Sequence, residues 1–476
     1  MDIITIFNTL FKWGILALIG TVLLLLILMG GYHFIYKKIL RGTHQFNKKQ
    51  WLITFLLLCW LLIVLALTTL SRGANYTGAL NIDFFSGYKN AWNKWSATEL
   101  QLIIFNMLMF TPLGFFLPLL WQKAKRFPII IVASLTVTIG IEILQFVTAR
   151  GIFELDDLIH NLLGSLFGYF CITGIISCLE KRKILIVPLL KLLLIPCIVG
   201  AVILSAIFLY KSQPYGNMTI LPAVKQDMSK IEIITELNFS QDRSTASIYK
   251  NHFADDKTHM QKIISLFSEI TNNTFSNSSR AEGENKIILG KQEDGTDVQL
   301  NYFIRSGTWQ FNSWKDWVKL SDAQVIKLQE KYESWLIQNR LLPADYQFTV
   351  ENKDTLRWYC QIPDNLTDKT EDFVQGSVLA QFDKSKQVST FGYQMMWNEY
   401  ITTEDIISPE QAYQEVLKGN FEQYIPFQSG DQLFITDFKI SYTYDTKGYY
   451  QPVYQFSGYI NTTENTWVCR IPALEK

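Results

Sequence analysis

Strongly polar side chains interrupt two long apolar runs in residues 142–164, a stretch that would otherwise suit a membrane interior. They are Glu142, Gln145, Arg150, Asp157 and Asn161. A sixth polar residue, Asn106, lies within an earlier apolar segment. Ionisable groups inside a bilayer are costly, so they usually pair with one another and mark a functional site. Carboxylates, amides and a guanidinium placed together suit either binding of a polar headgroup or acid–base chemistry.

Helical spacing brings these side chains together. Glu142 and Gln145 are three residues apart, which puts them on one side of a helix, and Asp157 and Asn161 are four apart on the next helix. Arg150 lies in the short connection between the two helices and is within reach of Glu142 or Asp157. Because an unpaired carboxylate is expensive to bury, we expect this cation to lie beside one of them.

Glycines and prolines accompany the polar residues at regular spacing. Gly164 and Gly168 continue the stripe of Asn161, where the missing side chain lets a neighbouring backbone approach closely. In the segment that carries Asn106, the residues Pro112, Gly114 and Pro118 lie within seven positions. Each proline removes one intrahelical hydrogen bond, so we expect this helix to be kinked or broken.

The elements that must position these residues are membrane-spanning helices. Apolar stretches long enough to cross roughly 30 Å of hydrocarbon predict six of them, near residues 14–36, 52–70, 101–121, 128–148, 157–178 and 192–210. The connections after the first, third and fifth helices carry eleven Lys and Arg, against five in the other connecting segments. The positive-inside rule then puts both the N-terminus and the C-terminal part outside the cytoplasmic membrane.

This orientation places Asn106, Glu142 and Asn161 in one layer, roughly 6 to 10 Å below the outer surface. Two interpretations stay open. The polar groups either satisfy one another and hold three helices together, or they form an outward-opening pocket for a headgroup or a small polar ligand. His160 falls on a different face of its helix, and we expect it to be solvated at the interface.

The two halves of the chain differ in charge and in pattern. Residues 1–210 hold 17 Lys and Arg against 8 Asp and Glu, and residues 211–476 hold 26 against 35. The second half alternates strand-like runs with amphipathic helices, one of them led by Ser321 and one by Ser408, each at capping-box spacing. We therefore expect an all-α membrane bundle at 1–210, followed by an extracytoplasmic α+β domain at 211–476.

A short motif, W-x-C-x-I-P, occurs at residues 358–363 and 467–472. It suggests two related subdomains, 211–363 and 364–476. An extracytoplasmic setting would permit a disulfide between Cys360 and Cys469, but equivalent positions of a duplicated fold need not touch, so this question stays open.

At its polar residues the sequence resembles the VanZ-like family of membrane proteins, over roughly residues 50–180. The match consists of N-x(5)-P-x-G-x(3)-P, E-x-x-Q, an arginine, and D-x(3)-N-x(2)-G-x(3)-G, beginning at Asn106, Glu142, Arg150 and Asp157. Gly151 departs from the family pattern, in which a small hydroxyl residue is commoner. The second half is weakly similar to extracytoplasmic modules of the PepSY or YycI type, which regulate or bind partners.

The resemblance implies a role in the bacterial cell envelope, mostly in Gram-positive organisms, and no defined reaction. The family takes its name from a member associated with low-level resistance to teicoplanin, a lipid-tailed glycopeptide. Expected partners are a membrane lipid or a lipid-tailed ligand and, for the second half, wall precursors or envelope proteins.

Signatures of other function classes are missing from the sequence. It contains no G-x-S-x-G, H-E-x-x-H or Walker A motif, and no Cys and His spacing typical of a metal site. We expect no metal, no cofactor and no nucleic acid. Three functions stay open: a non-enzymatic envelope protein, a sensor acting through the second half, or an intramembrane enzyme. For the enzyme, Glu142 or Asp157 would be the general base and Arg150 would hold a phosphate of a lipid-linked substrate.

Overall fold

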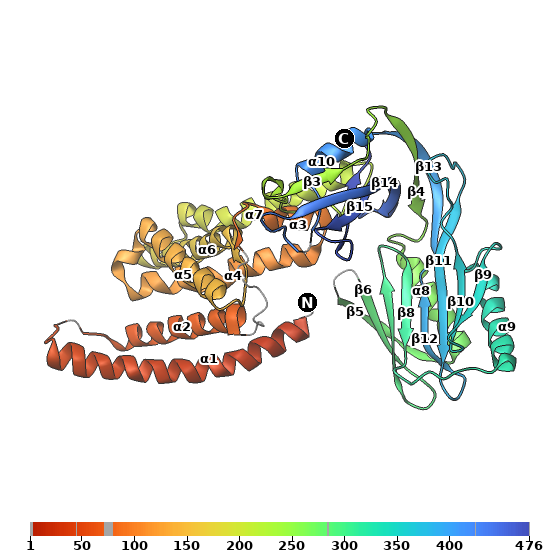
Figure 1. Ribbon diagram of the computed structural model, residues 1–476. Coiled ribbons are helices and arrows are strands. Elements are labelled where there is room, and N and C mark those ends of the chain that lie inside the picture. Colours follow the sequence, from red (N-terminus) through yellow and green to blue (C-terminus); the bar gives the residue numbers. More distant parts are fainter. Residues whose placement is uncertain (1–2, 44, 71–79, 283–284, 424, 476) are drawn as a thin grey trace. The chain divides into compact units, whose positions relative to one another are not determined.

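The structure is a computed structural model that describes residues 3–43, 45–70, 80–282, 285–423 and 425–475. The chain forms two compact units (Figure 1). The helical unit comprises Met1–Ala91 and Ala97–Ser212, and the soluble unit comprises Trp92–Ser96 and Gln213–Lys476.

Six long apolar helices make up most of the helical unit, and each is long and apolar enough to cross a membrane. They are α1 (Ile3–Gly31, continued by the π-helical turns η1, Tyr32–Ile39), α2 (Lys48–Leu65, continued by η2, Ala66–Leu70), α4 (Ala97–Leu120), α5 (Phe127–Val147), α6 (Leu155–Lys181) and α7 (Ile186–Ser212). The six expected spans are confirmed. The sequence did not predict the short helix α3 (Ser86–Lys94) or the parallel strand pair β1 (Leu80–Asn81) and β2 (Phe153–Glu154).

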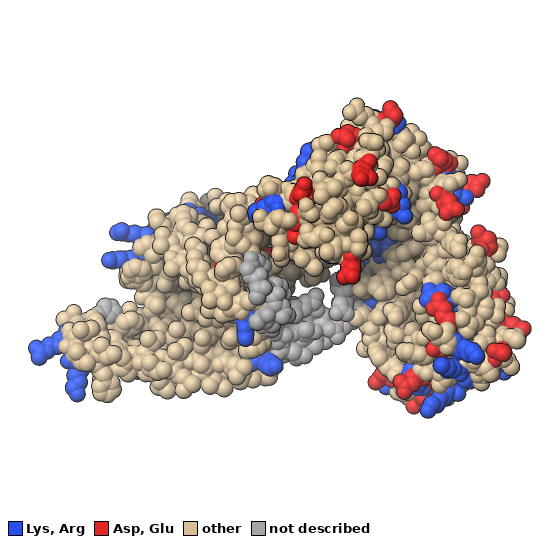
Figure 2. Space-filling model, viewed as in Figure 1, with Lys and Arg blue, Asp and Glu red and all other residues tan. Residues whose placement is uncertain are grey.

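Lys and Arg side chains gather at one end of the helical unit (Figure 2). The connections at this end are residues 40–47, the 3₁₀ turn η3 (Gln122–Lys125) and residues 182–185. Because consecutive spans alternate in direction, the three basic connections share one end, and the α5–α6 hairpin lies at the other.

The soluble unit is built on a 14-stranded mixed sheet with three helices, which confirms a β-rich fold with helices for this half. The strands are β3 (Glu232–Thr235), β4 (Ser244–Asn251), β5 (Thr274–Glu282), β6 (Asn285–Lys291), β7 (Asp297–Phe303), β8 (Thr308–Asn312), β9 (Gln347–Glu351), β10 (Thr355–Cys360), β11 (Phe373–Phe382), β12 (Val388–Tyr393), β13 (Met396–Ile406), β14 (Gln432–Tyr444), β15 (Tyr449–Ile460) and β16 (Thr466–Pro472). The helices are α8 (Lys257–Thr271), α9 (Asp322–Gln338) and α10 (Pro409–Leu417). Both predicted capping boxes are present, at Ser321 before α9 and at Ser408 before α10.

Two lobes share this sheet. One lobe contains β3, β14, β15, β16, β4 and β13, and the other runs from β5 through β8 and β12 to β10 and β9. Strand β11 belongs to both, because residues 373–375 pair with β13 while the rest of the strand pairs with β10 and β12. The strand changes partners at Gly376, whose φ of +110° and contact with the carbonyl of Gln394 exclude a side chain.

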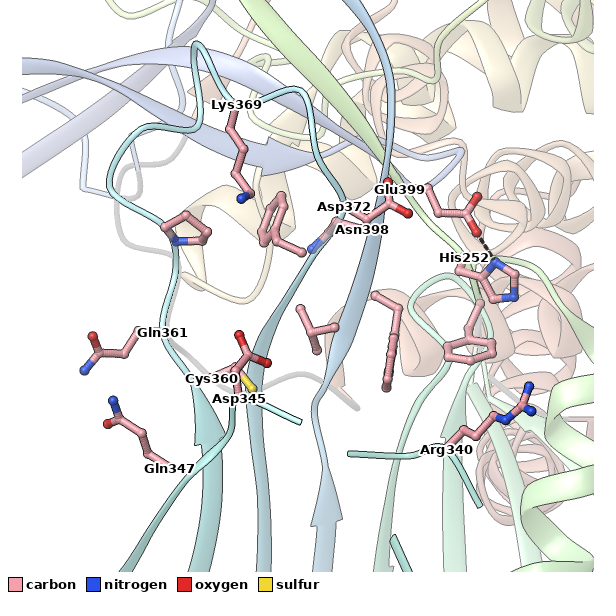
Figure 3. A pocket seen from close by; sticks show the side chains of 15 residues that line it. His252, Arg340, Asp345, Gln347, Cys360, Gln361, Lys369, Asp372, Asn398 and Glu399 are labelled. Atoms are coloured by element: carbon pink, nitrogen blue, oxygen red, sulfur yellow. Dashed lines mark hydrogen bonds and ion pairs between the residues drawn. The ribbon is translucent and has the colours of Figure 1, made fainter. Parts of the chain in front are cut away.

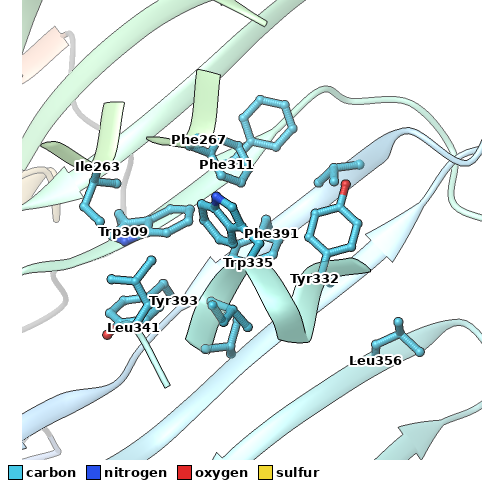
Figure 4. Packing of buried hydrophobic residues seen from close by; sticks show 14 of the residues in the cluster. Ile263, Phe267, Trp309, Phe311, Tyr332, Trp335, Leu341, Leu356, Phe391 and Tyr393 are labelled. Atoms are coloured by element: carbon cyan, nitrogen blue, oxygen red, sulfur yellow. The ribbon is translucent and has the colours of Figure 1, made fainter. Parts of the chain in front are cut away.

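Aromatic side chains fill the core of the second lobe (Figure 4). Phe267 of α8 lies 5.0 Å from the ring of Trp309 and 5.2 Å from that of Phe391, and Trp335 of α9 closes the cluster from the other helix. Large rings of this kind bury the most apolar surface per residue. Most tryptophans in this half therefore serve the core, although Trp314 and Trp317 are exposed.

The lobes do not follow the chain in order. Strand β4, from before residue 363, pairs with β13 and β15, whereas β11 and β12, from after it, pair with β10 and β8. The suggested subdomain boundary at residue 363 therefore does not separate the lobes. Cys360 ends β10 in one lobe, Cys469 lies in β16 of the other, and both thiols are free.

Candidate functional site

A buried polar cluster lies between α4, α5 and α6, at the end of the helical unit where the α5–α6 hairpin turns. We define it as Asn106, Glu142, Gln145, Asp157, His160 and Asn161. Four of its side chains are nearly inaccessible, with 1 to 4% exposure for Glu142, Gln145, His160 and Asn161. Asn106 donates to the carboxylate of Asp157 at 2.7 Å, so α4 and α6 are joined by a direct polar contact.

Backbone groups supply most partners of the α5 side chains. The carboxylate of Glu142 accepts a hydrogen bond from the backbone N–H of Glu154 at 3.1 Å and also lies against the carboxyl group of Asp157. Gln145 donates to the carbonyl of Thr68 at 3.2 Å, which ties α5 to η2. A Cβ at Gly151 would lie 2.9 Å from the amide oxygen of Gln145, so the departure from the family pattern leaves room for this amide.

The structure contradicts the expected position of Arg150. Its guanidinium donates to the carbonyl of Leu70 at a long 3.5 Å, and among the described residues it forms no ion pair with Glu142 or Asp157. The reason is local: the N–H of Arg150 caps α5 by bonding to the carbonyl of Gln145, and the side chain leaves the hairpin toward η2. The carboxylates are satisfied by N–H groups instead.

The expectation that His160 is solvated at the interface is also wrong. His160 is 2% exposed, its Nδ1 lies 3.7 Å from Asp157, and its ring packs 5.2 Å from that of Tyr88 in α3. Within the described structure neither ring nitrogen has a hydrogen-bond partner. This face of α6 was expected to be solvated, but the segment that carries Tyr88 packs over it.

Residues 80–88 cover the cluster, and Asp156 holds them there. Its carboxylate accepts hydrogen bonds from the N–H of Phe85 at 2.6 Å, the N–H of Gly87 at 2.9 Å and the hydroxyl of Ser86 at 3.2 Å. Burial, aided by the Asp156 charge, raises the pKa of Tyr88 to about 12, so its hydroxyl stays protonated. Asp156 was not predicted to be functional from the sequence, although consecutive acidic residues in a first helical turn are a signal for binding backbone N–H groups.

Smaller polar side chains extend the cluster deeper into the bundle. Ser134 and Thr138 continue the stripe of Glu142 at four-residue spacing, and Ser134 donates to Ser165 of α6 at 3.0 Å. The hydroxyl of Thr138 and the amide oxygen of Asn161 are buried and lack partners in the part of the chain that the structure describes. The four-residue spacing could have revealed these residues.

Glycines allow α4 and α6 to pack backbone against backbone. A Cβ at Gly164 would lie 1.7 Å from the carbonyl oxygen of Met107, and one at Gly168 would lie 2.0 Å from that of Thr111. Gly114 of α4 is equally close to the backbone of Ser165. This contact fixes the height of Asn106 against Asp157.

Of the two alternatives expected at the prolines of helix α4, a kink or a break, the break does not occur. The helix runs without interruption through Pro112 and Pro118. Trp60 of α2 donates to the carbonyl of Met109 at 2.6 Å, next to the carbonyl that Pro112 leaves without its helical donor. A neighbouring helix thus supplies a hydrogen bond where the proline weakens the ladder.

In this conformation the cluster is closed. Its donors and acceptors are covered by α4, α5, α6 and residues 80–88 rather than facing an open pocket. Unpaired buried polar atoms of His160, Asn161 and Thr138 each carry an uncompensated desolvation cost of about 1–3 kcal/mol. A polar headgroup that entered when residues 80–88 moved could supply the missing partners.

A second candidate site is a cleft of about 640 Å³ in the soluble unit, where β10 ends and β11 pairs with β13 (Figure 3). Charges of both signs line it, together with the rings of Phe253, Phe373 and Trp397; the charged residues are Arg340, Lys369, Asp345, Asp372 and Glu399. His252 and Glu399 pair at 2.5 Å across one side. Burial and the carboxylate of Asp345 raise the pKa of Cys360 to about 11, so this thiol is not a nucleophile at neutral pH.

These features define a multi-pass membrane protein that combines a helical bundle, containing a polar cluster, with a β-rich unit. Residues 51–177 match the VanZ/LLP1 family, so this part of the chain is a VanZ-like domain. No curated protein matches the sequence.

Among solved structures, a crystal structure of an uncharacterized protein from Eubacterium rectale is similar. It shares 13% identity, covers 51% of this chain and 87% of its own, and has a TM-score of 0.23.

Proposed function

We propose that this protein lies in the cytoplasmic membrane with its N-terminus and soluble unit outside, and that its polar cluster binds a lipid or a lipid-tailed ligand in the outer leaflet. Through this binding it modulates susceptibility to lipoglycopeptide antibiotics of the teicoplanin type. In this role the protein is not an enzyme, and its soluble unit contacts wall precursors or envelope proteins.

The observation that carries this proposal is a set of unpaired polar atoms inside the VanZ-like domain. Both ring nitrogens of His160 and the amide oxygen of Asn161 are buried without partners among the described residues. A purely structural cluster would be expected to satisfy such groups, because each one left unpaired costs stability. The gathering of Lys and Arg at the opposite end of the bundle supports an outer-leaflet position for the cluster (Figure 2).

The test is antibiotic susceptibility at equal expression. Glu142→Gln and Asn161→Ala should each abolish the effect of the protein on a lipid-tailed glycopeptide, while a glycopeptide without the tail should show little change. Thr136→Ala is the matched control, because Thr136 lies on the exposed face of α5 and, among the residues that the structure describes, bonds only to the carbonyl of Val132. If both cluster variants behave like the wild type, the proposal is wrong.

The enzyme hypothesis needs a cation beside the two carboxyl groups to hold a phosphate. Glu142 and Asp157 do lie together, but the guanidinium of Arg150 bonds to Leu70. Binding is therefore the better-supported role. Turnover of a lipid-linked phosphate by the purified protein, lost in Glu142→Gln, would reverse this preference.

The cleft in the soluble unit favours a sensor as the second candidate function. Arg340 and Asp345 are exposed at its rim, and neither has an ion-pair partner within the described residues. The double variant Arg340→Ala, Asp345→Asn in the full-length protein should therefore leave folding intact. If it abolishes the phenotype while the α5 and α6 variants do not, the function belongs to the soluble unit.

A further inference from the structure

A groove of about 290 Å³ opens between α6, α7 and η3, at the basic end of the helical unit. Its lining includes Lys125 of η3, Tyr169, Ser177 and Glu180 of α6, and Pro188 and Lys191 of α7. Asn161 and Ser177 are 16 residues apart on α6, which corresponds to about 24 Å. The groove is thus separate from the polar cluster and independent of the function proposed for it.

Closely packed helices form the floor of the groove. A Cβ at Gly174 would lie 3.4 Å from the side chain of Pro188, so α6 and α7 approach each other there. Tyr169 donates its hydroxyl to the carbonyl of Lys125 at 2.8 Å and fixes η3 against α6. The walls therefore come from three elements held by ordinary contacts.

The lining combines charged and apolar side chains. Glu180 lies near the end of α6, and Tyr169 lies eleven residues, or about 16 Å, further along the helix, level with Lys125 of η3, whose carbonyl it contacts. Apolar side chains, including Phe170 and Ile176, line the groove beside these polar groups. Charged and apolar surfaces next to one another at the end of a membrane bundle suit a lipid, whose headgroup and chains meet at the interface.

Two ammonium groups supply the positive charge of the groove lining. Lys125 and Lys191 are exposed, and within the described residues neither lies within 4.0 Å of a carboxylate. Lys191 is five residues inside α7, so its chain must extend toward the interface to solvate the charge. Both cations are therefore free to meet an anion at the headgroup level.

We propose that this groove binds an anionic phospholipid of the surrounding bilayer, with its phosphate between Lys125 and Lys191 and an acyl chain along Phe170 and Ile176. Basic pockets between spanning helices bind such headgroups by charge complementarity, and the apolar walls add chain contact. The volume holds a headgroup with its glycerol, so the rest of each chain lies in the bilayer.

The test is lipid binding by the full-length protein purified in detergent, followed by native mass spectrometry with added phosphatidylglycerol or phosphatidylcholine. The wild type should retain phosphatidylglycerol selectively, and Lys125→Gln/Lys191→Gln should lower its affinity at least tenfold. The matched control is Lys123→Gln/Lys183→Gln, because these exposed lysines lie at the same basic end of the helical unit but do not line the groove. An equal loss in both double variants would show diffuse attraction and overturn the site.

Two further experiments locate the ligand and identify its source. Ser177→Leu fills the groove without changing charge. Within the described residues Ser177 bonds only to the carbonyl of Thr173, so folding should survive. The substitution should weaken phosphatidylglycerol binding, and unchanged binding would place the lipid elsewhere. Soluble glycerol phosphate should not compete at millimolar concentration; full competition would identify the ligand as a free phosphate and overturn the lipid assignment.

Discussion

Asp156 is the residue through which the polar cluster is kept covered. Its carboxylate accepts two backbone N–H bonds and one hydroxyl bond from residues 85–87, and its side chain is 2% exposed. Hydrogen bonds to a charged group contribute about 1.5–3 kcal/mol each, more than neutral ones. The position of residues 80–88 over His160 therefore depends strongly on this one side chain.

Removing the carboxylate should release the cover. In Asp156→Ala, the amides of Phe85 and Gly87 lose their acceptor, so we expect their hydrogen exchange to accelerate at least tenfold, as a loss of about 1.4 kcal/mol or more implies. Hydrogen exchange read by mass spectrometry measures this. Asp83→Ala is the control, because Asp83 is exposed in the same segment. Unchanged exchange in Asp156→Ala would mean that other contacts hold the segment.

His259 gives the soluble unit a pH dependence. It is 5% exposed, its ring stacks 3.9 Å from Phe253, and its Nδ1 bonds to the hydroxyl of Tyr302 at 2.9 Å. Burial lowers its pKa to about 4, below the 6.5 of an unfolded chain. Between these values the unfolded state binds more protons, so stability falls as the pH drops.

His259→Gln should reduce this loss of stability. Between pH 7 and pH 5 the wild type should lose up to about 2 kcal/mol more than the variant, which has no group titrating in that window at this position. Unfolding followed by tryptophan fluorescence at the two pH values measures the difference. Parallel pH profiles for both proteins would show that another group is responsible.

At the scale of elements, the packing of α4 on α6 sets the geometry of the cluster. Three glycines bring the backbones of these helices into contact, and this contact positions Asn106 opposite Asp157. Bulk at a glycine would separate the helices and lengthen that hydrogen bond. Overpacking of this kind costs about 1–3 kcal/mol, and occasionally more where backbone must move.

Gly164→Ala should therefore lower the midpoint of thermal unfolding in detergent, because its Cβ would meet the carbonyl of Met107. Gly140→Ala is the matched control in α5: nothing lies within 4 Å of a Cβ there, and alanine is the better helix former. The control should unfold at the wild-type temperature or slightly above it. Equal effects of the two substitutions would argue against the close packing.

The sequence predicted the helices better than the side-chain contacts between residues far apart in the chain. Apolar length alone located all six spans, and cap signals located α9 and α10, because these are local properties. The position of Arg150 was wrong because its partner, the carbonyl of Leu70, is 80 residues away and no local pattern announces it. The burial of His160 was missed for the same reason, since it depends on the fold of residues 80–88.

At the scale of the whole molecule, the W-x-C-x-I-P motif suggested a subdomain boundary that does not separate the two lobes, because strands from both sides of it are interleaved. The strand pairs β4–β13 and β10–β11 join segments from both sides of residue 363, and long-range pairing of this kind leaves no spacing signal. What the sequence does carry at this scale is the contrast of charge between its halves. That contrast is the basis for the proposed orientation in the membrane.

Orientation can be tested with cysteine labelling in intact cells. A cysteine at Ser385, in the exposed turn between β11 and β12, should react with a membrane-impermeant maleimide, whereas one at Thr43, in an exposed basic connection, should not. The eleven Lys and Arg in the connections on the Thr43 side make it costly to place that end outside. Cys360, which is half-buried, and Cys469 are first replaced by Ser to remove background.

The opposite labelling pattern would overturn more than topology. Asn106, Glu142 and Asn161 would then lie in the cytoplasmic leaflet, so their ligand would have to be cytoplasmic, and a direct encounter with an external lipid-tailed antibiotic would be excluded. The lysine groove would face the outer leaflet, where it would meet a different set of lipids. Labelling at Ser385 alone is therefore the result that the proposed function requires.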